Sequence, residues 1–195
     1  MAAVDLTALC FAEAVPFAVT NGNSQNAPGG TFHVDRPGDR WGFQFVSRPY
    51  RVEPEGAEFQ ALFDDAEKHG GLFRVHQPGF DPGAPGTPVV ASTTSAGKLV
   101  PLTGLNPNYP IRRRQFVSFV VGGQRFLDRV MEEVVAGADG TAMLRLKNLL
   151  RVTLPAGTLA ELADPKIEGS VTFSSPSSWQ VNRLTTFAFT VTEDR

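Results

Sequence analysis

The sequence has little of what catalysis, metal binding and membrane insertion require. Its 195 residues include one cysteine, so a disulfide within the chain and a multi-cysteine metal site are excluded. None of the three histidines, His33, His69 and His76, stands at a spacing typical of zinc ligands. No apolar run approaches the roughly 20 residues that span a bilayer, and no basic start precedes an apolar leader. We therefore expect a chain that folds in a reducing cytoplasm, with no metal or other cofactor.

Charge of one sign is not in excess either. Eighteen Lys and Arg against twenty Asp and Glu leave a formal charge of -2, which lacks the broad basic field of a general DNA-binding protein. The single basic cluster is Arg112, Arg113 and Arg114, in the sequence PIRRRQF between a predicted turn and a strand. Two interpretations remain open for these arginines: a solvated turn, or a contact with an acidic partner, a passing polyanion or a neighbouring subunit.

Patterns that carry catalysis are also missing. There is no Gly-x-Ser-x-Gly elbow, and the glycines of GGQ and GADG lack the strand and helix that flank a phosphate-binding loop. The pairs Asp64-Asp65 and Glu132-Glu133 diverge on a helix or a strand alike, so we expect them on solvated faces. Cys10 is expected to be a small buried residue. The sequence predicts no catalytic residue, and we expect that the protein is not an enzyme.

Phenylalanine, glycine and proline are plentiful. Fifteen Phe stand against two Tyr and two Trp, with 19 Gly and 15 Pro, which favours aromatic strands joined by many turns. Alternation of apolar and polar residues predicts two strands around a turn at residues 36–39, and further strands at residues 72–77, 88–91, 98–102, 115–121, 158–162, 168–174, 179–182 and 186–193. Between residues 78 and 88, PGFDPGAPGTP predicts a long loop.

One helix is predicted, in EPEGAEFQALFDDAEKHGG. Pro54 suits a first helical position, and Gly70-Gly71 supplies a stop. Its apolar residues recur at helical spacing and form one stripe: Phe59, Leu62, Phe63 and Ala66. The helix should cover one face of a sheet.

The stretch RFLDRVMEEVVAGADGTAMLRL, residues 125–146, permits two structures. Its apolar spacing fits an amphipathic helix, whereas its surroundings favour a hairpin. Gly122-Gly123 is a two-residue hairpin connection, so a strand should return from Gln124 and pair with residues 115–121. Ala138-Asp139-Gly140, followed by alternating TAMLRL, then predicts a second turn. The context favours strands.

The predicted organisation is an extended N-terminal arm over residues 1–30 and a single β-rich domain over residues 31–195. Within the arm, TNGNSQNAPGG is expected to lack regular structure. A β-hairpin subdomain is expected at about residues 88–165. The fold class is mainly β with one α-helix, as a β-sandwich or split barrel.

The order of these elements resembles a known family. RWGFQF, the helix EGAEFQALFDDAEKHGG, LFRVHQP and a Pro-Gly loop, then LTGLNPN, a hairpin, VVAGADGTAMLRL, NLLRV and a terminal TVTED, are similar to tail-tube-fold minor tail proteins of long-tailed bacteriophages, the group that includes the distal tail protein. The resemblance covers roughly residues 30–193. It departs at RRRQF, where relatives often have Gly-Asp, and at NLLR, where they have a Pro-Pro-Leu-Arg-like segment.

The resemblance implies a β-sandwich or split barrel of the tail-tube type and a structural role in the virion. It implies a homo-oligomeric ring, commonly of six subunits, at the tail tip, with the tail tube protein and baseplate hub proteins as partners. It implies neither membrane association nor specific nucleic-acid binding, although DNA passes through such a ring. Synthesis is expected in the bacterial host cytoplasm.

Two alternatives remain open. The first alternative is another tail component of the same tube fold, a tail tube subunit or a terminator subunit. The second is a glycan-binding β-sandwich, with Trp41, Tyr50, Tyr109 and Trp179 as aromatic platforms for a sugar or cell-wall polymer.

Overall fold

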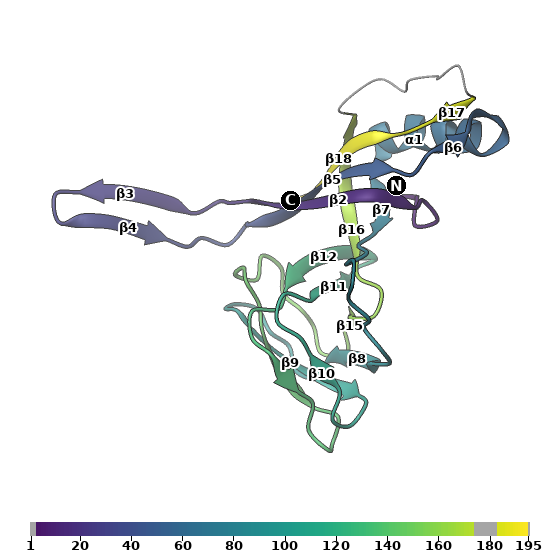
Figure 1. Ribbon diagram of the computed structural model, residues 1–195. Coiled ribbons are helices and arrows are strands. Elements are labelled where there is room, and N and C mark those ends of the chain that lie inside the picture. Colours follow the sequence, from purple (N-terminus) through teal and green to yellow (C-terminus); the bar gives the residue numbers. More distant parts are fainter. Residues whose placement is uncertain (1–2, 174–182, 195) are drawn as a thin grey trace. The chain divides into compact units, whose positions relative to one another are not determined.

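The computed structural model describes residues 3–173 and 183–194 (Figure 1). The chain is mainly β with a single α-helix, as predicted. Its internal contacts group it into two compact units. Unit 1 comprises Met1–Phe17, Trp41–His76 and Lys166–Asp194, and unit 2 comprises Ala18–Arg40 and Gln77–Pro165. Each unit contains its own six-stranded sheet.

The sheet of unit 1 assembles strands from both ends of the chain. Its order is β1-β7-β16-β18-β5-β2. The strands are β1 (Val4–Asp5), β2 (Phe11–Val19), β5 (Arg40–Ser47), β7 (Gly71–Arg74), β16 (Lys166–Phe173) and β18 (Ala188–Glu193). The central pairs β7-β16, β16-β18 and β18-β5 are antiparallel, and β1 pairs with β7 in parallel. A short pair, β6 (Tyr50–Arg51) and β17 (Leu184–Thr185), is separate from this sheet.

The core of unit 1 is a cluster of phenylalanine rings. Phe45, Phe73 and Phe189, on three strands of the sheet, have ring centroids 5.0 to 5.8 Å apart. Alternation along the strands points these rings to one face of the sheet. Phe63 of helix α1 (Ala57–His69) lies 4.8 Å from Phe189 and 5.0 Å from Phe187, so the helix closes over the cluster.

The predicted helix is confirmed, with two adjustments. It begins at Ala57, so the prediction that Pro54 is its first residue is wrong. Pro54 belongs to a separate short helical segment, Val52–Gly56, which the extended residue Glu53 interrupts. Helix α1 ends at His69, before Gly70, whose φ of 79° lies in the left-handed region that favours glycine. Of the predicted stripe, Phe63 and Ala66 are buried, Phe59 is half-buried against Tyr50, and Leu62 is 39% exposed. The apolar stripe is therefore narrower than its spacing indicated.

Unit 2 contains the second sheet, ordered β12-β11-β15-β8-β9-β14. The strands are β8 (Gly86–Val90), β9 (Leu99–Leu105), β11 (Phe116–Val121), β12 (Gln124–Arg129), β14 (Ala142–Arg145) and β15 (Leu159–Glu161). All of its pairings are antiparallel. Every strand matches a predicted segment to within a few residues. The Pro-Gly loop also carries no ladder before Gly86.

This sheet curls until its two edge strands meet. A bridge joins Val130 to Leu146, just beyond the ends of β12 and β14. Met131 N–H donates to Arg145 O (2.8 Å), and Lys147 N–H donates to Arg129 O (2.9 Å). The result is a split barrel closed at one end. Its interior is mainly aliphatic, filled by a cluster that includes Val100, Leu102, Val117, Phe119, Leu144 and Leu154.

The stretch at residues 125–146 contains no helix, which confirms the strand interpretation. Gly122 and Gly123 both have positive φ and connect β11 to β12, with Val121 paired to Gln124 as predicted. The second turn also forms, because Gly137 N–H donates to Thr141 O (2.8 Å). The chain before this turn does not form a simple hairpin with the chain after it, because β13 (Val134–Val135) pairs with β10 (Pro110–Ile111). A strand on a curled sheet changes partners where the curvature carries it away from its neighbour.

The expectation that TNGNSQNAPGG lacks regular structure is wrong. Strands β3 (Asn23–Ala27) and β4 (Gly30–Val34) form an antiparallel hairpin. Pro28 and Gly29 occupy the two-residue turn at its tip, where turn-forming residues are required rather than disruptive. Cross-strand hydrogen bonding then satisfies the backbone of the polar residues on either side.

Three further expectations concern single segments. The predicted strands around residues 36–39 both form, as β4 and β5, but each pairs with other strands rather than with the other. The predicted strand at residues 179–182 lies outside the described residues. Cys10 is exposed, contrary to expectation. It lies in the link between β1 and β2, where its N–H donates to the Tyr50 hydroxyl (2.7 Å) and its O accepts from Arg48 N–H (3.1 Å). Among the described helices, none is long and apolar enough to cross a membrane.

Replacing Phe63 with alanine should remove the ring that joins α1 to the sheet. Its side chain is fully buried, so we expect a loss of about 3–5 kcal/mol in the free energy of unfolding. Urea denaturation followed by circular dichroism measures this loss. The matched control is Leu62→Ala on the same helix, where the 39% exposed side chain should cost below about 1 kcal/mol. Equal effects of the two changes would contradict the assignment of the buried face.

Replacing Gly140 with alanine tests the second turn of unit 2. Gly140 has a φ of 73°, and an added Cβ would collide with the backbone oxygen of Leu105. Gly122→Ala is the control, because Gly122 has a φ of 60° and open space around its Cα. We expect about 1–2 kcal/mol of destabilisation for Gly122→Ala from the backbone conformation alone. Gly140→Ala should cost clearly more in the same denaturation measurement.

Candidate functional site

The basic turn, Arg112, Arg113 and Arg114, is held in place by its backbone. Gln115 N–H donates to Arg112 O (3.2 Å), and Arg112 N–H donates to the Gln115 side-chain oxygen (3.1 Å). The Gln115 side-chain nitrogen is buried and donates to Leu162 O (3.2 Å). Arg114 has a φ of 71°, and its N–H donates to Val130 O (2.8 Å). The turn is thus anchored to three strands or strand extensions of unit 2.

A second side chain clamps the turn from the other direction. The Gln77 side-chain nitrogen donates to Arg114 O (3.0 Å), while its oxygen accepts a hydrogen bond from Phe116 N–H (2.9 Å). Both the nitrogen and the oxygen of the Gln77 side-chain amide therefore hydrogen-bond to the backbone that leaves the turn. This clamp fixes where the arginine side chains start.

All three arginine side chains are exposed. The Arg112 guanidinium carbon lies 5.5 Å from the centroid of the Phe80 ring, a cation–π contact that orients it. Within the described residues, none of the three arginines forms an ion pair. A fixed backbone with three outward guanidinium groups can bind carboxylates or phosphates.

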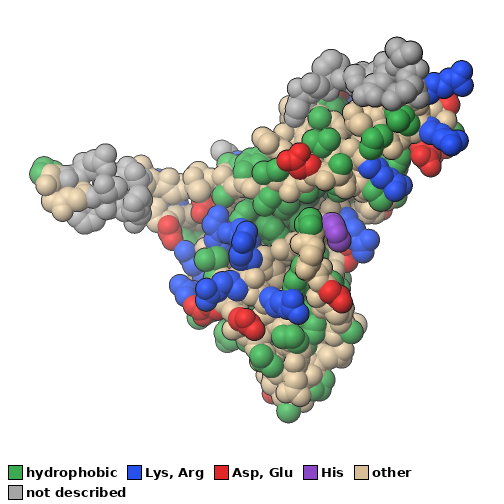
Figure 2. Space-filling model, in the orientation of Figure 1, with side chains coloured by type: hydrophobic (Ala, Val, Ile, Leu, Met, Phe, Trp, Pro, Cys, Tyr) green, Lys and Arg blue, Asp and Glu red, His purple; other side chains and the backbone are tan. Residues whose placement is uncertain are grey.

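Two further cations extend this positive surface. Burial lowers the pKa of Arg129, and the nearby charge of Arg114 lowers it further. Burial likewise lowers the pKa of Lys147, and Arg129 adds to the effect. Mutual repulsion of this kind requires the cations to lie close together. The backbone geometry agrees, because Arg114 N–H donates to Val130 O (2.8 Å) and Lys147 N–H donates to Arg129 O (2.9 Å). Figure 2 shows Lys and Arg side chains gathered over unit 2.

Two carboxylates of the same unit already have partners within the chain. Asp128, 8% exposed, accepts hydrogen bonds from Arg129 N–H (2.7 Å) and Asn148 N–H (3.3 Å). Its charge opposes the pKa shifts of both Arg129 and Lys147. Glu132, on the exposed stretch after β12, pairs with Arg145.

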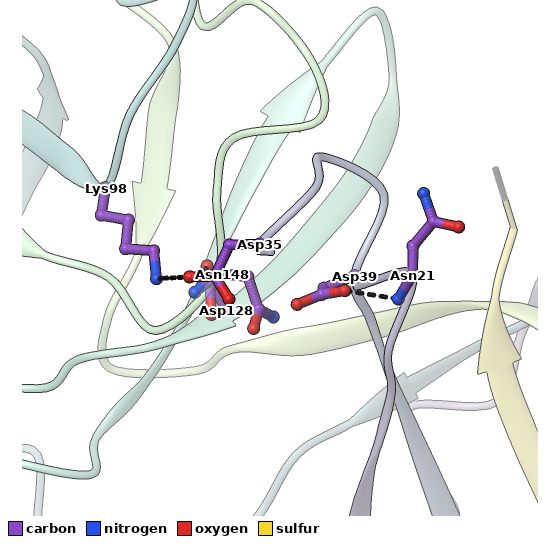
Figure 3. A network of polar contacts seen from close by, with 6 residues as sticks. All are labelled: Asn21, Asp35, Asp39, Lys98, Asp128 and Asn148. Atoms are coloured by element: carbon purple, nitrogen blue, oxygen red, sulfur yellow. Dashed lines mark hydrogen bonds and ion pairs between the residues drawn. The ribbon is translucent and has the colours of Figure 1, made fainter. Parts of the chain in front are cut away.

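A cavity of about 650 Å³ lies at the base of the β3-β4 hairpin. It is lined by Val19, Thr20, Asn21, Pro37, Gly38, Arg40, Phe126, Arg151 and Val152. The hairpin base is fixed by Asn21, whose N–H donates to Asp39 (2.6 Å) and whose side-chain nitrogen donates to Pro37 O (2.9 Å). Figure 3 also shows the ion pair of Lys98 Nζ with Asp35 (2.7 Å), which joins the residue after β4 to the residue before β9.

The cavity combines an aromatic wall with positive charge. The Arg151 guanidinium carbon stands 4.9 Å from the Phe126 ring centroid, and Arg40 lines the same space. Such a lining suits a small group that carries a carboxylate or phosphate. The cavity is open to solvent rather than enclosed.

The aromatic platforms considered for glycan binding are largely inaccessible. Trp41, Tyr50 and Tyr109 are 2%, 3% and 7% exposed. The Tyr109 hydroxyl also donates to Pro82 O (2.6 Å), so the ring is held inside unit 2. A sugar needs an exposed ring face on which to stack, and these three rings offer none. Trp179 lies outside the described residues.

The other residues considered for chemistry do not converge. Asp64, Asp65, Glu132 and Glu133 are exposed, as expected of solvated faces. His69 contacts Asp65 at 2.8 Å, one turn earlier on the same helix. Within the described ranges, no group of three or more His, Cys, Asp and Glu side chains is placed to hold a metal ion.

Sequence reasoning identified the basic turn but missed Arg129 and Lys147. One signal for Arg129 was present, because a two-residue turn at Gly122-Gly123 places it opposite Phe116, two residues beyond Arg114. Lys147 carried no such signal. It joins the cations only because the sheet curls and its edges meet.

Comparison of the sequence with protein-family models finds no match, and a search of curated proteins finds none either.

The clamp on the basic turn can be tested through Gln77. Gln77→Ala should free the backbone after the turn, and the Phe116 amide should exchange its hydrogen roughly tenfold faster or more. Hydrogen exchange read by NMR measures this directly. The control is Gln60→Ala, which removes an exposed side-chain contact with Asp64 on α1 and should leave Phe116 unchanged. Unchanged Phe116 protection in Gln77→Ala would contradict the clamp.

Proposed function

We propose that the protein is a structural component of a bacteriophage tail tip, a subunit of the distal-tail type. Copies of the chain form a ring, of six subunits in the family it resembles, that connects the tail tube to the baseplate or hub. The ring lies in the virion, and DNA passes through it without sequence-specific contacts. The observation that carries the proposal is one long edge strand that leads into a hairpin arm.

The edge strand is β2. It is nine residues long and ends the sheet of unit 1, so in the part of the chain that the structure describes it has a strand neighbour on one side only. Pro16 fits this place, because proline has no N–H to give and is confined to edge strands or irregular positions of a sheet. A long edge is a template for a strand of another chain. Rings of sheet proteins can be built from such pairings.

The arm is the hairpin of β3 and β4, which directly follows β2 (Figure 1). These strands pair only with each other among the described strands. A two-stranded ribbon without further strands is marginal in water and gains stability by packing against something else. A neighbouring subunit in a ring would supply that contact.

The first test is the size of the native assembly. Native mass spectrometry and negative-stain imaging of the purified chain should show rings of six copies. Stacked rings that grow into tubes would favour a tail tube subunit over an adaptor, because an adaptor occurs as one ring. A chain that stays monomeric at high concentration and does not join purified tails would overturn the proposal.

A charged residue on the edge strand should weaken the ring. Val15 of β2 is 43% exposed, and Val15→Lys places a charge where a neighbouring strand would pair. We expect at least a tenfold higher concentration for half-assembly, measured by mass photometry across a dilution series. Leu159→Lys is the matched control, since Leu159 is also 43% exposed but belongs to β15, which has strands on both sides. An equal effect of both changes would argue against edge pairing.

A further inference from the structure

Charge is divided unequally between the two units. The segments of unit 1 carry eleven Asp and Glu against six Lys and Arg, whereas those of unit 2 within residues 18–40 and 77–165 carry nine against eleven. The near-neutral total therefore hides an acidic unit and a mildly basic one. Opposite charge on two parts of one chain favours contact between copies.

The acidity of unit 1 is concentrated on one element. Residues 53–69, here called the acidic segment, hold six carboxylates against one lysine. They comprise the turn before α1 and α1 itself. The six carboxylate side chains are exposed, because α1 turns Phe63 and Ala66 inward and its charged residues outward. Two of them make local contacts: Asp64 with Gln60, and Asp65 with His69.

The positive counterpart is the basic turn of unit 2. Its three guanidinium groups are exposed on a backbone that is clamped from both sides, as described above. Arg129 and Lys147 add positive potential beside it. Guanidinium groups form two-pronged hydrogen bonds with carboxylates, which fixes orientation as well as attraction.

We propose that the acidic segment of one copy docks onto the basic turn of the next copy. Such a contact is head-to-tail, because each copy uses one surface for one neighbour and the other surface for the other neighbour. Head-to-tail contacts build closed rings when the rotation closes. The inference rests on the proposed ring function and names a surface through which successive subunits recognise each other.

Charge reversal tests the contact without touching the core. The first variant carries Arg112→Glu, Arg113→Glu and Arg114→Glu. The second carries Glu58→Lys, Asp64→Lys and Asp65→Lys. Each variant places like charges at the contact, and like charges across an interface cost several kcal/mol, so we expect on the order of a hundredfold weaker assembly. Mass photometry over a dilution series measures the change, and circular dichroism checks that each variant is folded.

Mixing the two variants is the decisive experiment. In an equimolar mixture, the acidic turn of the first variant faces the basic helix of the second, and the unchanged surfaces of each also match. The mixture should therefore assemble with alternating copies at concentrations where neither variant assembles alone. A chain that carries all six reversals should assemble alone as well. A merely structural effect of either triple change could not be rescued in this way.

A matched control separates local charge from total charge. The change Arg36→Glu, Arg74→Glu shifts the net charge in the same direction as reversal of the basic turn, by four charges rather than six, at exposed positions outside both proposed surfaces. It should leave assembly within about threefold of the original. Raising the salt concentration should weaken the original assembly and the rescued mixture alike, because exposed charges are screened.

The outcomes separate this inference from the proposed function. If the original chain forms rings that neither triple reversal weakens, the docking contact is wrong and the ring remains. If the original chain does not assemble, both fall. Rings that persist while reversal of the basic turn abolishes retention of a duplex DNA would assign the turn to a polyanion and overturn the contact.

Discussion

The packing of phenylalanine rings in unit 1 is the interaction on which the rest of this structure depends. Phe45, Phe73 and Phe189 come from three strands that are far apart in the sequence, and Phe63 joins them from the helix. Phe11, near the beginning of the chain, stacks on Phe45 at 4.2 Å. Packing of these rings therefore holds the beginning, an early segment and the end of the chain in one sheet. All that lies between must leave unit 1 and return to it. Those two excursions, residues 18–40 with the hairpin arm and residues 77–165, together make up unit 2.

The two units solve the problem of sheet edges in different ways. In unit 2 the sheet curls, and backbone hydrogen bonds around the bridge of Val130 and Leu146 join its outer strands. Unit 1 ends on β2, whose outer side has no strand partner among the described strands. Exposed edges promote uncontrolled association unless something covers them. An edge strand that a neighbouring copy covers would turn this liability into the contact that builds an assembly.

In the proposed ring, charge would provide the order that edge pairing alone lacks. A sheet edge can accept many strands, whereas opposite charges on two units of one chain favour one arrangement of neighbours over others. The acidic segment and the basic turn are both exposed and both fixed by well-packed elements. Their pairing between copies would make the ring interface directional. It would also be sensitive to salt, which offers a route to controlled assembly and disassembly in the laboratory.

Much of the local structure was readable from local patterns. Glycine pairs fixed the β11-β12 hairpin, alternation located most strands, and the helix ended at its glycine stop. Local patterns failed where pairing partners are distant. The polar segment before residue 30 gave no sign of β3 and β4, because cross-strand pairing rather than apolar spacing stabilises it. The strand partner of Val134–Val135 could not be predicted from local sequence either, because it depends on how the sheet curves.

The candidate site shows the same division. The sequence by itself determined that Arg112, Arg113 and Arg114 form the one basic cluster, and that the chain is mainly β with one helix. Only the tertiary structure decided that Lys147 lies next to Arg129, and that three aromatic candidates for sugar stacking are buried. The physical reason is the distance along the sequence between the residues that decide each feature. Turns and strand periodicity arise from neighbouring residues, whereas burial and the clustering of charge depend on which distant segments the fold brings together.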